Sequence, residues 1–167
     1  MAANPWVGTV SIKGVIDMSS LAKGDAPISS GFTASVTNGG SAGEAERLLS
    51  VAVSLGAGAT TTLDFTALSA TGETPSVAAT WNVQEINGIW FEADSANGST
   101  ITVEPAAANP ITTYHAAAGQ WVVSAGGHMG AFNVSHTVSA GALGLLITNN
   151  DGGAVATGTL LVLARTA

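Results

Sequence analysis

The stretch VQEINGIWFEADSANGSTITVE, residues 83–104, holds the densest aromatic run of the chain and a turn-like Asn-Gly pair. Side chains at every second position of a strand share one face. That period places two apolar runs on strand faces, namely Ile89, Phe91 and Ala93, and then Ile101 and Val103. Two consecutive strands are therefore expected here.

A tight turn is expected to join these two strands into a hairpin. A two-residue turn would set Phe91 opposite Glu104, which places an apolar side chain against a carboxylate. A three-residue loop, 96–98, with Gly98 in the left-handed region, sets Phe91 opposite Val103 instead. The sequence therefore predicts the three-residue loop.

The other face of the first strand is mixed in character. The period of two places Ile86 and Trp90 there, together with Glu92 and Asp94. Apolar side chains on the polar side of a strand are typical of a central strand or of a surface that meets another subunit. Trp90 is therefore one candidate interface residue.

Alternation also predicts strands over 48–55 and 60–66, and a hairpin between them. Residues 67–80 are rich in Ser, Thr, Gly and Pro, and are expected to cross between two sheets. Further short strands follow at spacings of about 8 to 12 residues. The predicted fold class is all-β, an antiparallel two-sheet β-sandwich or jelly roll. An immunoglobulin-like sandwich without its disulfide is the alternative.

The chain divides into two expected parts. Residues 1–43, with scattered Gly, Ser and Pro, are interpreted as an irregular N-terminal arm or a set of edge strands. Residues 44–167 are interpreted as the β-sandwich domain. At 167 residues, the chain is long enough to bury a substantial core.

Composition excludes several functions. Charged residues form 9% of the chain, against roughly 25% in an average protein, which favours an extensive assembly. The net charge is −7 and the four basic residues are scattered, so direct nucleic-acid binding is not expected. No cysteine is present. We expect no signal peptide in MAANPWVG and no membrane partner, because the longest apolar runs are far shorter than a membrane span.

Candidate chemistry is sparse. The three histidines, His115, His128 and His136, match no metal-ligand spacing, and His136 is expected to be a satisfied core or interface residue. The acids Glu85, Glu92, Asp94 and Glu104 could form an acid-base pair, but outward carboxylates also keep a sheet face soluble. The run NNDGG, 149–153, lacks the alternating ligands of a calcium loop and is interpreted as a turn. No catalytic motif occurs, so we predict no enzyme, no cofactor and no metal.

The order of several segments resembles a family of small structural proteins of tailed-bacteriophage particles. The segments are TTLDFTA (61–67), residues 85–94, STITVEPAAANP (99–110), QWVVSAGG (120–127), GLLITNN (144–150) and TGTLLVLA (157–164). The resemblance covers about residues 59–167. It implies a jelly-roll or β-sandwich protein of the virion, most plausibly a capsid decoration or cement protein, with no catalytic residues.

The resemblance implies a location and partners. We expect the chain on the capsid surface of the virion, bound to the lattice of the major capsid protein and to itself as a homotrimer or dimer. Contact faces suited to that role are expected around Trp6, Phe32 and Trp90. Two alternatives remain: a phage tail or fibre component, and a carbohydrate-binding β-sandwich module. The second is motivated by four tryptophans, Trp6, Trp81, Trp90 and Trp121.

Overall fold

A computed structural model of the chain describes residues 8–16, 28–36, 45, 47–73, 76–114 and 119–167. Almost all regular structure in this part is β-strand. The strands are β1 (Gly8–Ile16), β2 (Ile28–Val36), β3 (Arg47–Leu55), β4 (Thr60–Asp64), β5 (Leu68–Glu73), β6 (Ser76–Trp81), β7 (Val83–Ala93), β8 (Ile101–Pro105), β9 (Trp121–Val123), β10 (His128–Thr137), β11 (Gly144–Asn149) and β12 (Ala156–Thr166). One 3-10 turn, η1 (Phe65–Ala67), follows β4.

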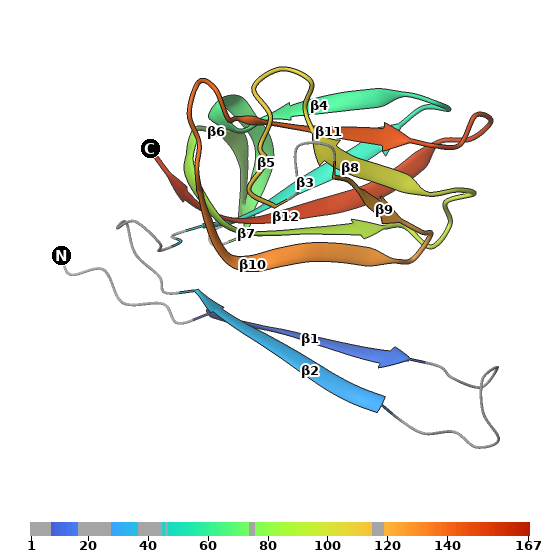
Figure 1. Cartoon of the computed structure of the whole chain (residues 1–167), viewed down its shortest axis with the longest axis horizontal. Helices are drawn as coiled ribbons and strands as arrows, with labels where there is room; N and C mark the ends of the chain where they lie inside the picture. The colour runs from blue at the N-terminus through green and yellow to red at the C-terminus, as the bar shows by residue number, and fades with distance from the viewer. Residues whose placement is uncertain (1–7, 17–27, 37–44, 46, 74–75, 115–118) are drawn as a thin grey trace.

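Two antiparallel sheets form the sandwich (Figure 1). The six-stranded sheet has the order β10-β7-β12-β3-β5-β6, and the four-stranded sheet has the order β4-β11-β8-β9. The first half of the sandwich pairs with the second half in reverse order: β3 with β12, β4 with β11, β7 with β10, and β8 with β9. This is the pairing of a long hairpin rolled into two sheets, which is a jelly roll. The β5–β6 hairpin adds two strands to the six-stranded sheet, next to β3.

The core lies between the two sheets. Alternating residues of β3 point inward, as predicted, and Leu49 is fully buried. The predicted inward faces of β7 and β8 are confirmed, because Ile89, Phe91, Ile101 and Val103 are all 0% exposed. Burial of such apolar surface is the main contribution to the stability of a sandwich. The predicted fold class is therefore confirmed.

The predicted hairpin of residues 83–104 is wrong. Strand β7 pairs with β10 and β12, whereas β8 pairs with β11 and β9 in the other sheet. Residues 94–100 thus cross between sheets, and Gly98 does not have a positive φ. Asn97 explains the crossing, since its side-chain oxygen accepts a hydrogen bond from the Thr157 amide (2.9 Å) and its Nδ2 donates to the Thr157 carbonyl (2.8 Å). Its amide group takes the place of a strand partner for β12.

Two other predicted connections are also wrong, because the expected hairpin is a crossing between sheets and the expected crossing is a hairpin. Strands β3 and β4 were expected to form a hairpin, but β4 pairs with β11 in the opposite sheet. Residues 67–80 were expected to cross between sheets, but they form the β5–β6 hairpin in register from Leu68–Trp81 to Glu73–Ser76. Trp81 stabilises that hairpin, because its Nε1 donates to the Ala70 carbonyl (3.0 Å).

A bulge in β7 overturns the predicted side of Ile86. Gly88 pairs with Leu163 while Ile86 pairs with the next residue, Ala164, so Asn87 is an extra residue in β7. An extra residue reverses the inward and outward positions beyond it. Ile86 is consequently 0% exposed in the core rather than on the face that carries Trp90.

The N-terminal strands pair with each other. Strands β1 and β2 form a two-stranded antiparallel sheet, in register from Gly8–Val36 to Ile16–Ile28, apart from the two sandwich sheets. The proposed division at residue 43 lies outside the described residues and stays a prediction. Over the ranges given above, we find no helix with the length and apolar character needed to span a membrane.

Candidate functional site: a groove on the outer face of the six-stranded sheet

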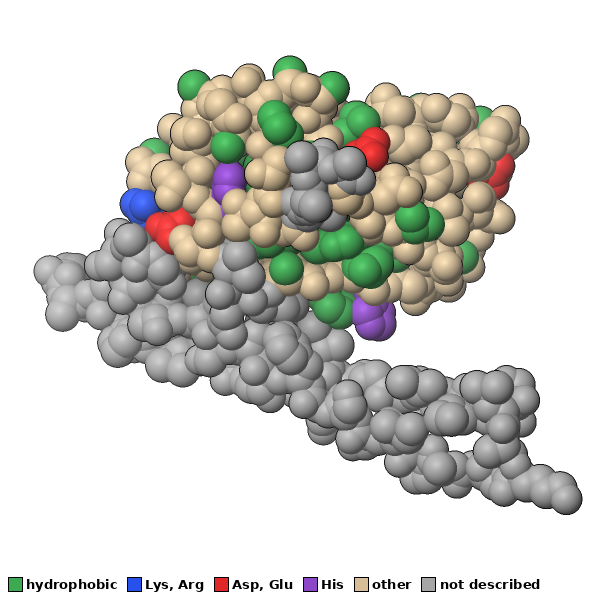
Figure 2. Space-filling model, in the orientation of Figure 1, with side chains coloured by type: hydrophobic (Ala, Val, Ile, Leu, Met, Phe, Trp, Pro, Cys, Tyr) green, Lys and Arg blue, Asp and Glu red, His purple; other side chains and the backbone are tan. Residues whose placement is uncertain are grey.

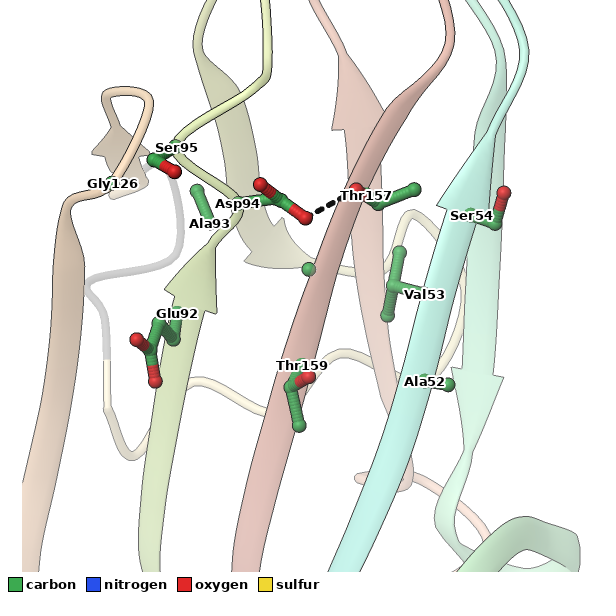
Figure 3. A pocket seen from close by; sticks show the side chains of 11 residues that line it. Ala52, Val53, Ser54, Glu92, Ala93, Asp94, Ser95, Gly126, Thr157 and Thr159 are labelled. Carbon is green, nitrogen blue, oxygen red and sulfur yellow. Dashed lines mark hydrogen bonds between the residues drawn. The ribbon is translucent and has the colours of Figure 1, made fainter.

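A groove of about 680 Å³ lies on the outer face of the six-stranded sheet, where β7, β12 and β3 run side by side (Figure 3). Its principal lining side chains are Ala52, Ser54, Glu92, Asp94, Thr157 and Thr159. We call this feature the outer-face groove. It combines two carboxylates with four hydroxyl groups, those of Ser54, Ser95, Thr157 and Thr159.

Strand register brings these residues together. Thr159 of β12 lies between Glu92 of β7 and Ala52 of β3, and Thr157 lies opposite Ser54. Directly opposed residues of antiparallel strands point to the same face. The side chains on β3 and β12 are small, whereas those on β7 are longer acids. The hollow follows from this difference in side-chain size.

The two acids of the groove have different surroundings. One oxygen of Asp94 accepts a hydrogen bond from the Ala96 amide (2.8 Å), and the other accepts from the Thr157 hydroxyl (3.3 Å). Figure 3 shows Asp94 directed toward β12 and Glu92 turned away from it. Glu92 is exposed, and its carboxylate makes no hydrogen bond or ion pair with another described residue. The Glu92 carboxylate is thus available to a ligand, whereas both oxygens of Asp94 already accept hydrogen bonds that hold the turn after β7.

Trp90 lies two residues before Glu92 on the same face of β7. Its ring stacks on that of His128, with centroids 4.6 Å apart and planes inclined by 27°. The close approach needs Gly130, because a Cβ at that position would lie 2.5 Å from Cε3 of Trp90. The half-buried indole therefore lies over β10 beside the groove. Aromatic faces next to carboxylate and hydroxyl groups are chemically suited to a polyhydroxylated ligand.

A second polar cluster lies where β7 meets β12 and β10, and it corrects the expectation for Glu85. Its carboxylate is 2% exposed rather than on a solvated face. Nε and Nη2 of Arg165 both donate to Oε2, at 3.2 and 3.1 Å, and the Ser135 hydroxyl donates to Oε1. Glu85 and Arg165 lie directly opposite each other on β7 and β12, and Ser135 lies on β10. This cluster connects three neighbouring strands.

Tyr114 and His136 lie close to this cluster. Tyr114 donates from its hydroxyl to the Ile86 carbonyl (2.8 Å). Burial, followed by the negative charge of Glu85, raises the pKa of the Tyr114 phenol well above its ordinary value near 10. His136 is 7% exposed, with Nδ1 2.5 Å from the Thr113 hydroxyl and Nε2 3.0 Å from the Ala142 carbonyl. The prediction of a satisfied histidine at this position is confirmed.

Residues 149–153 form a turn, as predicted. Nδ2 of Asn149 donates to three carbonyl oxygens, those of Leu55 (3.2 Å), Gly56 (2.8 Å) and Ala154 (2.8 Å). Asp151 accepts hydrogen bonds from the Gly153 and Ala154 amides (2.8 and 3.1 Å). The polar atoms of this loop are used to hold the connections between the two sheets.

The predicted interface residues are described to different extents. Trp6 lies outside the described residues, as does His115. Phe32 is part of β2, where the backbone alone is described. Trp90 lies on the outer face beside the groove. In the described ranges, no three His, Asp or Glu side chains come together as a group that could hold a metal ion.

The sequence predicts only half of the groove. The outward positions of Glu92 and Asp94 follow from the alternation in β7. Thr157 and Ser54 could not be assigned to the same site, because their positions depend on the pairing of β12 with both β7 and β3.

Comparisons with models of protein families, with curated proteins and with solved structures gave no match.

Proposed function

We propose that the chain is a structural protein of a bacteriophage particle that decorates or cements the head, where it binds the lattice of the major capsid protein. The observation that carries this proposal is the order of the segments that resemble the virion family. They fall, one after another, on β4, β7, β8, β9, β11 and β12 of the jelly roll. The segments that resemble the family thus form most of the sandwich.

Rigidity supports a role in reinforcing a shell. The Glu85–Arg165 pair joins two strands of one sheet, and Asn149 joins two connections, β3–β4 and β11–β12, at the end of the sandwich. Buried groups with satisfied hydrogen bonds hold a fold in one conformation. A cement protein needs such a scaffold together with a broad contact surface.

The outer face of the six-stranded sheet is the contact surface that fits this role. Trp90 and Leu161 lie directly opposite each other on that face, and both are half-buried. Figure 2 shows that charged side chains are sparse on the visible surface, in keeping with a charged content of 9%. Interfaces are depleted of charge at their centre and enriched in aromatic residues. We therefore place the lattice contact around Trp90.

The experiment is to identify the protein on particles and then to rebind it. Mass spectrometry of purified phage particles should find the chain, and recombinant protein should bind particles that lack it. Trp90→Ala should weaken this binding at least tenfold, whereas Val122→Ala, which truncates an exposed residue of the other sheet, should leave it unchanged. Absence of the chain from purified particles would contradict the proposal.

A carbohydrate-binding module is the second candidate, because the outer-face groove places Glu92 and hydroxyl groups beside Trp90. Such a module would bind glycans on an array, and Glu92→Gln would weaken that binding. An array without any bound glycan would remove this candidate. A tail or fibre location is distinguished from the head by microscopy of labelled particles.

A further inference from the structure

The two sandwich sheets have four outer edges, and three of them are protected against pairing with another strand. Strand β9 has only three residues. Strand β10 contains a register shift between Phe132 and His136. Strand β4 ends at Asp64, whose carboxylate accepts the Thr66 amide (2.8 Å) and turns the chain into η1. Short length, bulges and charges are the devices by which natural edge strands avoid association.

Strand β6 has none of these devices. Its sequence, SVAATW, contains no charge and no proline over six residues. One edge pairs with β5 along its whole length, and no strand among the described residues lies beside the other edge. Such an edge presents a row of unpaired backbone N–H and C=O groups.

Both faces of β6 are open as well. Residues 77–80 are all exposed, and Val77 is 46% exposed although it is apolar. Successive residues of a strand point to opposite faces, so neither side of β6 is covered there. The strand is therefore accessible to a partner from its edge and from both faces.

We propose that β6 is a self-association site, at which β6 of a second copy of this chain adds in antiparallel orientation about a two-fold axis. Opposed residues in an antiparallel pair point to the same face, so one residue of β6 must lie opposite its own copy, with the axis midway between the two. Ala78 and Ala79 are the middle residues. With the axis at Ala78, Val77 lies opposite Ala79 of the second copy, and Ser76 lies opposite Thr80. The two six-stranded sheets then become one continuous sheet.

The charge pattern selects a second copy as the occupant. A two-fold axis sets a strand against itself, so any charged residue near the axis would lie close to its own like charge. Strand β6 carries no charge that would repel a copy, and none that would attract an acidic or basic partner. Small alanine side chains at the centre permit close approach from either face. This inference does not depend on the virion role, although it gives that role a specific self-contact.

Cysteine cross-linking tests the contact directly. The chain has no cysteine, so the single-cysteine variants A78C and A79C can form only intermolecular disulfides. Mild oxidation should cross-link at least one of them, the one on the axis, in high yield. Ala57→Cys, in the exposed turn after β3, is the matched control and should cross-link no more than random collision allows.

Light scattering over a concentration series supplies the second measurement. The wild-type mass should rise from 16.4 kDa toward twice that value. A78K should remain at 16.4 kDa, while A57K behaves as the wild type. At the lowest concentration, where all three proteins are monomers, they should melt alike. A wild-type protein that stays monomeric, with A78C and A79C no more cross-linked than A57C, would overturn the inference. A trimer mass would also overturn it, since two-fold strand pairing closes at two copies. Either result leaves the particle-binding test unaffected.

Discussion

Replacing Arg165 by methionine should destabilise the sandwich, because it leaves the Glu85 carboxylate buried without its cation. Glu85 is 2% exposed, and Arg165 contacts one of its oxygens through two nitrogens, at 3.1 and 3.2 Å. Removing one partner of a buried pair costs about 3–5 kcal/mol. The Arg165 side chain is 23% exposed, so water reaches the site and the lower end applies, about 3 kcal/mol.

The assay is equilibrium unfolding in urea at pH 7, together with thermal melting. A loss of about 3 kcal/mol lowers the melting temperature of a domain of this size by about 6–12 °C. The double variant R165M/E85Q should recover at least half of the loss, because no unpaired charge remains. Glu92→Gln is the matched control on the same strand, and it should change stability by less than about 0.5 kcal/mol. Our reasoning is refuted if R165M is as stable as this control, or if the double variant is less stable than R165M.

Three further predictions concern single residues. Tyr114 is the only tyrosine, so absorbance at 295 nm reports its ionisation alone. Since the folded state holds the phenolic proton more tightly than the unfolded state, the stability due to Tyr114 is complete below pH 10 and falls as the pH rises above 10. At pH 11 the unfolded chain should be about 90% ionised and the folded chain far less; a folded midpoint near 10 would be the contrary result. Gly130→Ala should cost about 1–3 kcal/mol and change the fluorescence of Trp90, whereas Gly141→Ala, with open space around it, should be neutral; equal melting of the two variants would contradict this. Asn149→Ala should cost about 1–3 kcal/mol in urea unfolding, because three carbonyl oxygens lose their donor; wild-type stability would show that these bonds contribute nothing.

Strand positions could be predicted from the sequence, whereas strand partners could not. The alternation over β3 and β7 identifies the inward side chains, because the period of two depends on the strand alone. Which strands pair depends on contacts between distant residues. In a rolled hairpin, strands that follow each other in the chain lie mostly in opposite sheets. Turn-like sequences such as Asn97-Gly98 therefore connect a strand of one sheet to a strand of the other.

The bulge at Asn87 shows the second limit of sequence reasoning. A strict period of two places Ile86 outward, but the extra residue reverses that side and brings Ile86 into the core. The burial of Glu85 was equally hidden, because its partner Arg165 lies 80 residues later in the chain. Half of the groove could be predicted, namely the two acids on β7, and the hydroxyl groups that complete it could not.

The proposed role depends on where the protein lies on a particle. A map of the assembled phage by electron microscopy measures this directly. We predict density for the jelly roll on the outside of the head shell, with the Trp90 face of the six-stranded sheet against the capsid lattice. Density for this chain on the tail alone, or a head shell without it, would contradict the account.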